Sequence, residues 1–417
     1  MFWSSISLLT FSMFLNSPVA GLGSVGKQGF SVVWNMPTAR CEQRFGVSLP
    51  LKKFGIIYNH RQRFLGENIS LFYEQRLGLY PYINQQRERV NGGIPQLGFL
   101  KAHLAVTEHQ IRDFMKESFI GLAVLDWEAW RPLWRRNYGP KKIYHKLSKE
   151  LVKVKHPEIS ETEVTIQAAI EFEQSAKAFM NETLHIGLQT CPKGLWGFYG
   201  FPSCYNGHGA KEDGYTGRCK PRTQMMNDRL AFLWQHSTAL YPSIYVRRVL
   251  AGNPNTQLMV RHRVLEALRV ASQHSPGRHP PPVLPYATVA FTQTLQFLNQ
   301  TDLDFTLGES AALGAAGVVL WGNLAFSKSK RHCLILNDYI SSVLGVYVDA
   351  LRRGVELCTK VVCHDKGRCI RRDPHSGHMI PMLDFLSQSA HEVRSKFKCA
   401  CYEGWSGEYC EKGITPE

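Results

Sequence analysis

The chain has 417 residues, of which 44% are hydrophobic and 20% are charged. This balance is typical of a globular protein with a large core and excludes a low-hydrophobicity disordered chain. Lys and Arg number 49 against 34 Asp and Glu, so the formal net charge is +15. A basic surface suits a polyanionic partner such as nucleic acid, anionic lipid or an acidic polysaccharide, but charge alone does not separate these partners from general solubility.

The N-terminus predicts a signal peptide over residues 1–20. An apolar core near residues 6–15 leads into small residues around Ala20, although no Lys or Arg precedes it. No later run of about 18 uncharged apolar residues follows, and the final ITPE is not the hydrophobic tail of a lipid-anchor signal. We therefore expect a protein of the secretory pathway, secreted or lysosomal, with no transmembrane segment and no GPI anchor.

Short apolar runs alternate with helical patterns along the next part of the chain. The runs read as buried parallel strands and lie at 30–34, 54–58, 121–127, 194–199, 242–246, 282–287 and 316–321. Helices are expected at about 100–117, 140–155, 160–187, 222–239, 256–274, 303–315 and 332–352. This alternation predicts an α/β fold, and seven strands in succession favour a (β/α) barrel over residues 21–355. The segment 59–99 reads as a long functional loop.

Cysteine density changes near residue 356. Six of the 11 cysteines lie in the last sixty residues, which predicts a disulfide-rich module over 356–412. Zinc binding is the alternative, but the spacing contains no CxxC pair. Glycosylation sequons start at Asn68, Asn181 and Asn299 and are compatible with secretion.

The stretch VLDWEAW, residues 124–130, places Asp126 and Glu128 inside an apolar and aromatic run. On a strand they share one face, with Cα atoms roughly 6.5–7 Å apart. Two carboxylates this close raise one pKa and create a proton donor, which cleavage of a glycosidic bond requires. The alternative is a structural ion pair with Arg131 or Arg135, and spacing does not decide between the two.

Aromatic residues stand at several predicted strand ends. Tyr199, Tyr245 and Trp321 each close a strand, and Trp130 lies beside the carboxylates. Aromatic faces and hydroxyl groups suit the binding of a sugar ring. Core filling is the alternative for each residue singly, whereas their shared position at strand ends favours a site.

Five motifs, in the same order along the chain, resemble those of one protein family. VLDWEAWRPLW, GLWGFYGFPSCYN, ALYPSIY, RHRVLEALRVA and GESAALGAAGVVLW are similar to the animal hyaluronidases, glycoside hydrolase family 56. The resemblance spans about Phe30 to Cys410 and implies a distorted barrel followed by an EGF-like module. It implies hydrolysis of β-1,4 bonds of hyaluronan next to N-acetylglucosamine, with retention, and leaves chondroitin as a further substrate open.

The resemblance also implies a division of roles within the site. Glu128 is the acid/base, and Asp126 orients the reacting group. The substrate's own acetamido oxygen acts as nucleophile, one of the exceptions to the two-carboxylate rule. Tyr199 and Tyr245 position the acetamido group, and Trp321 packs on its methyl.

Three further residues are carried over from the same motifs. Tyr73 and Tyr286 would line the cleft. Arg263 is a candidate for binding a substrate carboxylate, since Arg matches carboxylate geometry, and an internal ion pair is an equal alternative. No cofactor and no metal are expected.

The resemblance implies five disulfides: Cys41–Cys333, Cys204–Cys219, Cys358–Cys369, Cys363–Cys399 and Cys401–Cys410. The remaining Cys191 is expected to be a buried small apolar residue. No acidic calcium-binding sequence precedes Cys358, so calcium is not expected.

The leading hypothesis is an active, monomeric hyaluronan hydrolase. A non-catalytic hyaluronan-binding or adhesion protein on the same fold is the alternative. A nucleic-acid binder rests on charge alone, and the signal peptide and the disulfides argue against it.

Overall fold

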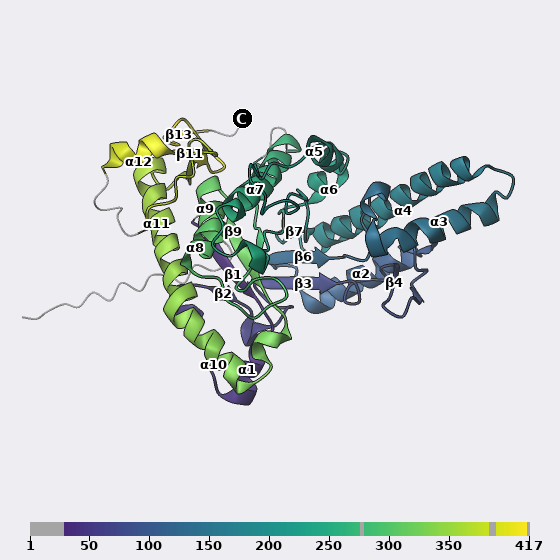
Figure 1. Cartoon of the computed structure of the whole chain (residues 1–417), viewed down its shortest axis with the longest axis horizontal. Coiled ribbons are helices and arrows are strands. Elements are labelled where there is room, and N and C mark those ends of the chain that lie inside the picture. Colours follow the sequence, from purple (N-terminus) through teal and green to yellow (C-terminus); the bar gives the residue numbers. More distant parts are fainter. Residues whose placement is uncertain (1–28, 276–278, 383–388, 415–417) are drawn as a thin grey trace, which may run out of the picture.

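The computed structural model describes residues 29–275, 279–382 and 389–414. The predicted signal peptide over 1–20 lies outside these residues. Parallel strands form the centre of the molecule and helices surround them, with the C-terminal segment packed at one end (Figure 1).

The strands form two parallel sheets. The first has the order β2 (Ile57–Tyr58), β1 (Ser31–Asn35), β9 (Gly317–Trp321) and β8 (Tyr286–Thr288). The second has the order β3 (Ile69–Tyr73), β6 (Leu122–Asp126) and β7 (Leu195–Phe198). Most of their residues are buried, as expected for parallel strands covered on both faces. The predicted parallel α/β fold is confirmed.

Backbone bridges and side chains connect the margins of the two sheets. Parallel bridges pair Tyr199 with Tyr241 and Ser243 with Tyr286, so the segment between β7 and β8 joins the sheets on one side. On the other side, Asn59 Nδ2 donates to the Ile69 carbonyl at 2.7 Å. The predicted strand at 242–246 is thus reduced to isolated bridges.

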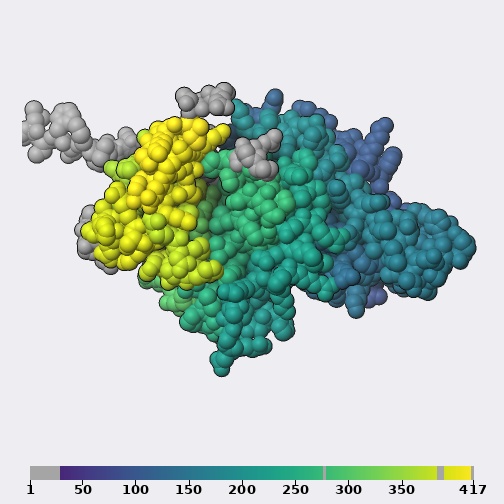
Figure 2. All heavy atoms as spheres, turned by 90° about the horizontal axis from the view of Figure 1, so that it is seen from above, coloured from purple at the N-terminus to yellow at the C-terminus, as the bar shows by residue number. Residues whose placement is uncertain are grey.

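The helices follow the predicted order. They are α1 (Ala39–Phe45), α2 (Leu100–Phe114), α3 (Lys142–Lys155), α4 (Glu161–Thr190), α5 (Pro221–Asp228), α6 (Ala231–His236), α7 (Asn255–Gln273), α8 (Gln300–Leu303), α9 (Glu309–Leu313), α10 (Lys330–Tyr339), α11 (Gly345–Cys363) and α12 (Ala390–Lys396). The capping box of Ser160 and Glu163 starts α4. Helices α3 and α4 form a hairpin that projects from the body (Figures 1 and 2).

Two expectations about single segments were wrong. The segment 59–99 is not only a loop, because it contains β3 and the short pair β4 (Tyr82–Ile83) and β5 (Arg89–Val90). The apolar run of β3 is followed directly by turn-forming residues, so the sequence of this segment resembles a loop. The expected single helix at 222–239 is two helices, α5 and α6, separated by a turn at 229–230.

A long helical segment carries the chain into its C-terminal part. Residues 330–363 are long and apolar enough to cross a membrane by length and composition alone. However, Leu336, Ile340, Leu344 and Val348 are fully buried in the main core, which is the pattern of a core helix. The predicted domain boundary at 355/356 falls inside α11.

Beyond α11 the chain forms small antiparallel pairs. Strand β10 (Gly367–Arg371) pairs with β11 (Phe397–Cys401), and β12 (Trp405–Ser406) pairs with β13 (Lys412–Gly413). Disulfides join Cys41–Cys333, Cys204–Cys219, Cys358–Cys369, Cys363–Cys399 and Cys401–Cys410, the pairs that the resemblance implies. Cys191 is the free cysteine of the described ranges and is buried.

A buried ion-pair cluster fastens the C-terminal segment to the helices. Arg371 Nη2 and Arg261 Nε lie 2.8 Å and 2.6 Å from the two oxygens of Glu309. The side chains of Glu309 and Arg371 are 0% exposed. Because burial of a charge is costly without a partner, these three residues depend on one another.

The three sequons occupy different environments. Asn299 is exposed and caps α8. Asn68 Nδ2 donates to the Tyr58 carbonyl at 2.8 Å, between β2 and β3. Asn181 lies within α4, and the Thr183 of its sequon is buried. Asn299 therefore offers the most accessible side chain of the three.

Candidate active site

The carboxyl ends of neighbouring strands bring the predicted residues together. Tyr73 ends β3 and pairs in register with Asp126, which ends β6. Tyr199 follows β7, and Trp321 ends β9. In parallel α/β folds the reacting groups lie at this edge of the sheet.

The two carboxylates differ sharply in exposure. Asp126 is 8% exposed, and its Oδ1 atom is buried with no hydrogen-bond partner among the described residues. Because β6 ends at Asp126, Glu128 lies in the following loop, and its side chain is 54% exposed. Arg131 Nη2 donates to Glu128 Oε1 at 3.3 Å. The structure therefore combines the two sequence-based alternatives, the neighbouring carboxylates and the ion pair with Arg131. Glu128 lies beyond the end of β6, so the alternation of side chains along a strand does not apply to it.

Burial favours the protonated form of Asp126. It raises the pKa of Asp126 to about 8, the negative charges of Glu128 and Glu74 add to this effect, and Arg131 opposes it. At neutral and acidic pH, Asp126 is therefore protonated. The site presents a buried neutral carboxyl group beside an exposed carboxyl group.

The raised pKa of Asp126 predicts a pH-dependent stability. Between its ordinary pKa of 3.8 and about 8, the folded state binds the proton more tightly than the unfolded state does. The free energy of unfolding should therefore fall as pH rises through this window, by up to about 1.4 kcal/mol for each pH unit. Asp126→Asn should remove this part of the slope, as measured by urea unfolding at a series of pH values.

The exposed Asp213 supplies the matched control for this measurement. Asp213→Asn should leave the slope between pH 4 and 8 as it is in the parent, because it replaces an exposed carboxyl group and not a buried one. An Asp126→Asn variant with the parental slope would contradict the assignment of the proton to Asp126.

An aromatic wall continues from the carboxylates across the strand ends. The rings of Tyr199 and Tyr245 are 6.0 Å apart, and Tyr245 stacks on Trp321 at 6.0 Å. Trp321 Nε1 donates to Tyr73 Oη at 3.1 Å. Four aromatic side chains, three at the ends of β3, β7 and β9 and one from the segment between β7 and β8, thus form one contiguous set.

The tyrosine hydroxyl groups of this wall remain protonated. Burial raises the pKa of Tyr199 to about 12, and it raises the pKa of Tyr245 well above its ordinary value. A hydrogen bond links the two hydroxyls. Tyr199 and Tyr245 are therefore hydrogen-bonding groups at working pH and not bases.

A sequence model of the hyaluronidase family matches residues 21–414. The chain belongs to this family. Hyaluronidase-3 of Homo sapiens is 44% identical over 391 residues, covering 94% of this chain and 93% of that protein. Hyaluronidase-1 of Sus scrofa is 40% identical over 429 residues, covering 97% of this chain and 98% of that protein. The resemblance deduced from the motifs is confirmed.

Solved structures of the hyaluronidase family share the fold. The crystal structure of bee venom hyaluronidase superposes with a TM-score of 0.69 at 34% identity, covering 77% of this chain and 99% of that one. Its complex with a hyaluronic acid tetramer superposes with a TM-score of 0.70 at 33% identity, covering 77% and 98% of the two chains. Nearly the whole length of each bee venom chain is therefore matched by a part of this chain.

Arg263 has partners inside the protein. Its Nε donates to Asn206 Oδ1 at 2.9 Å and its Nη1 donates to the Ser243 carbonyl at 3.0 Å. Burial lowers its pKa. Within the described residues Arg263 therefore forms no internal ion pair, because both of these hydrogen bonds go to neutral oxygen atoms. They place Arg263 behind the segment that carries Tyr245.

Two expected substrate-binding residues lie inside the core instead. Trp130 is 2% exposed, stacks on Tyr80 at 4.9 Å and donates from Nε1 to the Pro81 carbonyl at 2.7 Å. Tyr286 is 1% exposed and packs edge-on against Tyr199 at 5.0 Å. Neither side chain reaches the surface of this structure. Direct substrate contact by Trp130 and Tyr286 stays a prediction.

Sequence reasoning missed Glu74 and Lys141 as site residues and named Arg131 only as a structural partner of the carboxylates. Burial raises the pKa of Glu74, and the charge of Glu128 adds to the rise. Lys141 Nζ donates to the Glu128 carbonyl and, at 3.3 Å, to that of Ala129. The site thus balances three carboxyl groups against two cations. Recognition of β3 as a strand would have placed Glu74, which directly follows Tyr73, at the same sheet edge.

Proposed function

We propose that this member of the hyaluronidase family is an endo-β-N-acetylhexosaminidase that hydrolyses the β-1,4 bonds of hyaluronan. One observation carries the proposal: a buried, protonated Asp126 next to an exposed Glu128, at a strand end ringed by aromatic residues. A carboxyl group that reaches solvent can donate a proton to a leaving oxygen. The family of the chain and the names of its relatives support the same activity.

In the first step, Glu128 donates its proton to the oxygen of the breaking glycosidic bond. The acetamido oxygen of the same N-acetylglucosamine attacks the anomeric carbon, so that the C–O bond breaks and a cyclic oxazolinium forms. Asp126 lies beside Glu128 and is therefore suited to orient the acetamido nitrogen. No carboxylate on the opposite side of the sugar ring is required.

In the second step, the Glu128 carboxylate accepts a proton from water as the water attacks the anomeric carbon. This attack opens the ring, restores the acetamido group and leaves the product with retained configuration. Glu128 is again protonated for the next cycle. The ion pair with Arg131 stabilises the carboxylate form between the two steps.

The aromatic wall holds the sugar during both steps. Tyr199 and Tyr245 hydrogen-bond the acetamido group through their protonated hydroxyls, and Trp321 packs on its methyl. Tyr73 lies beside both Trp321 and Asp126 and contacts the same sugar. Arg263 supports the backbone below Tyr245 and so has a positioning role.

We also propose that the two sheets form one distorted (β/α) barrel over residues 21–355. The bridges at Tyr199 and Ser243, together with the Asn59 and Asn68 contacts, support closure on both sides. The disulfide-linked strand pairs after α11 form the EGF-like module over 356–412.

The protein enters the secretory pathway and is secreted or lysosomal. It carries a glycan at Asn299 at least, and it acts as a monomer.

The proposed function is tested by the products formed from hyaluronan. The purified protein is incubated with hyaluronan, and separately with chondroitin, from about pH 3.5 to about pH 8.5. We expect even-numbered saturated oligosaccharides with N-acetylglucosamine at the reducing end. Unsaturated products would indicate a lyase, and intact polymer would favour the non-catalytic binder.

A further inference from the structure

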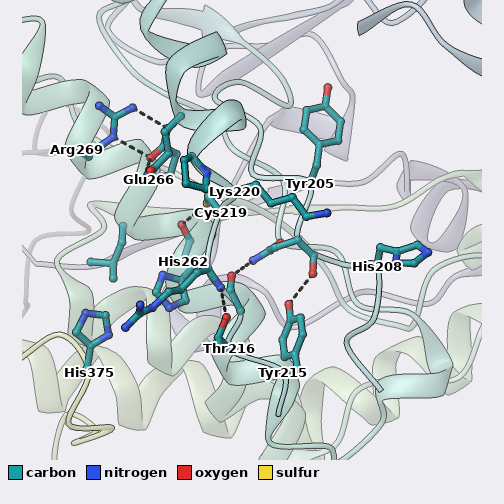
Figure 3. Close-up of a pocket in the computed structure, with 16 residues that line it drawn as sticks. Tyr205, His208, Tyr215, Thr216, Cys219, Lys220, His262, Glu266, Arg269 and His375 are labelled. Atoms are coloured by element: carbon teal, nitrogen blue, oxygen red, sulfur yellow. Dashed lines mark hydrogen bonds and ion pairs between the residues drawn. The ribbon is translucent and has the colours of Figure 1, made fainter. Parts of the chain in front are cut away.

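A large groove lies outside the strand ends, between three parts of the chain. Its volume is about 860 Å³, within the range of binding sites for small molecules. The loop closed by Cys204–Cys219, helix α7 and the C-terminal segment at His375 form its walls (Figure 3). The side chains that matter for its chemistry are Tyr205, His208, Arg218, Lys220, His262 and His375.

The groove carries cations without matching anions. Glu266 is the one carboxylate among its described lining residues. Its Oε1 accepts hydrogen bonds from Arg269 Nη2 at 2.8 Å and Asn227 Nδ2 at 2.7 Å, and its Oε2 accepts from Arg269 Nε at 2.9 Å. Arg218 and Lys220 are exposed, and no ion pair engages either of them within the described ranges. Two long cationic side chains are therefore free to meet an anion from solution.

His262 lies half-buried in the groove wall, near several cationic groups. Burial is the main cause that lowers the pKa of His262 to about 4, His375, Arg261 and Arg218 contribute to the fall, and Glu309 opposes it. His262 packs against His375 with ring centres 5.6 Å apart. The neutral His262 thus leaves Arg218 and Lys220 as the cations that would bind a ligand.

The C-terminal segment is needed to complete the groove. Arg261 Nη1 donates to the His375 carbonyl at 3.2 Å, and Arg371 Nη1 donates to the Pro374 carbonyl at 3.1 Å. Both arginines are held by the buried Glu309. The ion-pair cluster therefore fixes His375 opposite the disulfide loop, so the docked C-terminal segment supplies one part of the groove wall.

A strip of basic and aromatic residues leads from Glu128 towards this groove. Arg131, which pairs with Glu128, packs over Phe201 at 4.9 Å. Arg136 packs over Tyr205 at 4.2 Å, and Tyr205 lines the groove. Such stacked arginines bind carboxylates and sugar faces together.

We propose that this groove is a second binding site for carboxylate groups of an acidic polysaccharide, which holds a part of the hyaluronan chain outside the reacting centre. The proposal rests on the proposed function for the identity of the polymer. Hyaluronan carries a carboxylate on every second sugar, so a chain long enough to pass the strip from Glu128 offers an anion to Arg218 and Lys220. The C-terminal module thereby contributes to the binding of long substrates.

The test compares long and short substrates in one double variant. Arg218→Ala/Lys220→Ala should bind a hyaluronan fragment of about 20 sugars roughly tenfold more weakly, since two charge-assisted contacts are lost. Binding is measured by calorimetry in a Glu128→Gln background that prevents turnover. Without that background, the double variant should cleave a hexasaccharide at the parental kcat/KM and long hyaluronan with a raised KM.

The control double variant is Arg40→Ala/Lys193→Ala, which removes the same two charges from exposed residues that do not line the groove. An equal loss of affinity in both double variants, or none in the groove variant, would overturn the second site. If the parent binds the fragment through the groove but cleaves nothing, the proposed function fails while the groove stands. If the parent cleaves and the groove variant binds normally, only the groove fails.

Discussion

Replacing Glu128 by Gln is expected to reduce the rate of hyaluronan hydrolysis by about 10²–10⁴-fold or more, because the amide can neither donate the proton nor activate water. The fold should survive, since the Glu128 side chain is 54% exposed and its described side-chain partner is Arg131 alone. Reducing ends released from hyaluronan measure the rate, and thermal unfolding measures the fold.

The matched control is Glu150→Gln on α3, which removes an exposed carboxylate 3.8 Å from Lys146. This variant should keep the parental rate. The Glu128→Gln protein should still bind hyaluronan, which separates loss of chemistry from loss of substrate. Hydrolysis at the parental rate in Glu128→Gln would reject the role of Glu128 as acid and base.

Glu309→Gln should lower the free energy of unfolding by about 3–5 kcal/mol, the cost of leaving buried charge without its partner. Burial opposes ionisation of Glu309, but the hydrogen bonds and charges of Arg371 and Arg261 outweigh it and hold its pKa below the ordinary value. The ionised cluster therefore persists on acidification until pH falls to that lowered pKa. Urea unfolding at neutral pH measures the loss.

The matched control for this prediction is Asp349→Asn, which breaks an exposed ion pair of 2.7 Å with Arg353 on α11. A surface pair of this kind contributes less than about 1 kcal/mol. Equal losses in the two variants would show that burial does not govern the Glu309 cluster. The Glu309→Gln protein should also bind long hyaluronan more weakly, because the loop with His375 loses its anchor.

Local sequence determined much of this protein by itself. The apolar runs predicted the parallel strands because a strand covered on both faces has no polar side. The spacing in VLDWEAW placed Asp126 at the end of β6 with Glu128 two residues later. The motifs around them also identified the family, since the residues that carry chemistry lie within short continuous stretches.

The tertiary structure alone decided which residues act and how. Asp126 is protonated because it is buried, and burial depends on the whole fold, whereas Glu128 is exposed to solvent. Trp130 lies in the core although its sequence position resembles that of a site residue. The groove joins Arg218 to His375 across more than a hundred residues, and no local pattern predicts such a contact. Exposure and long-range contact are properties of the packed chain, and they separate the catalytic groups from the residues that support them.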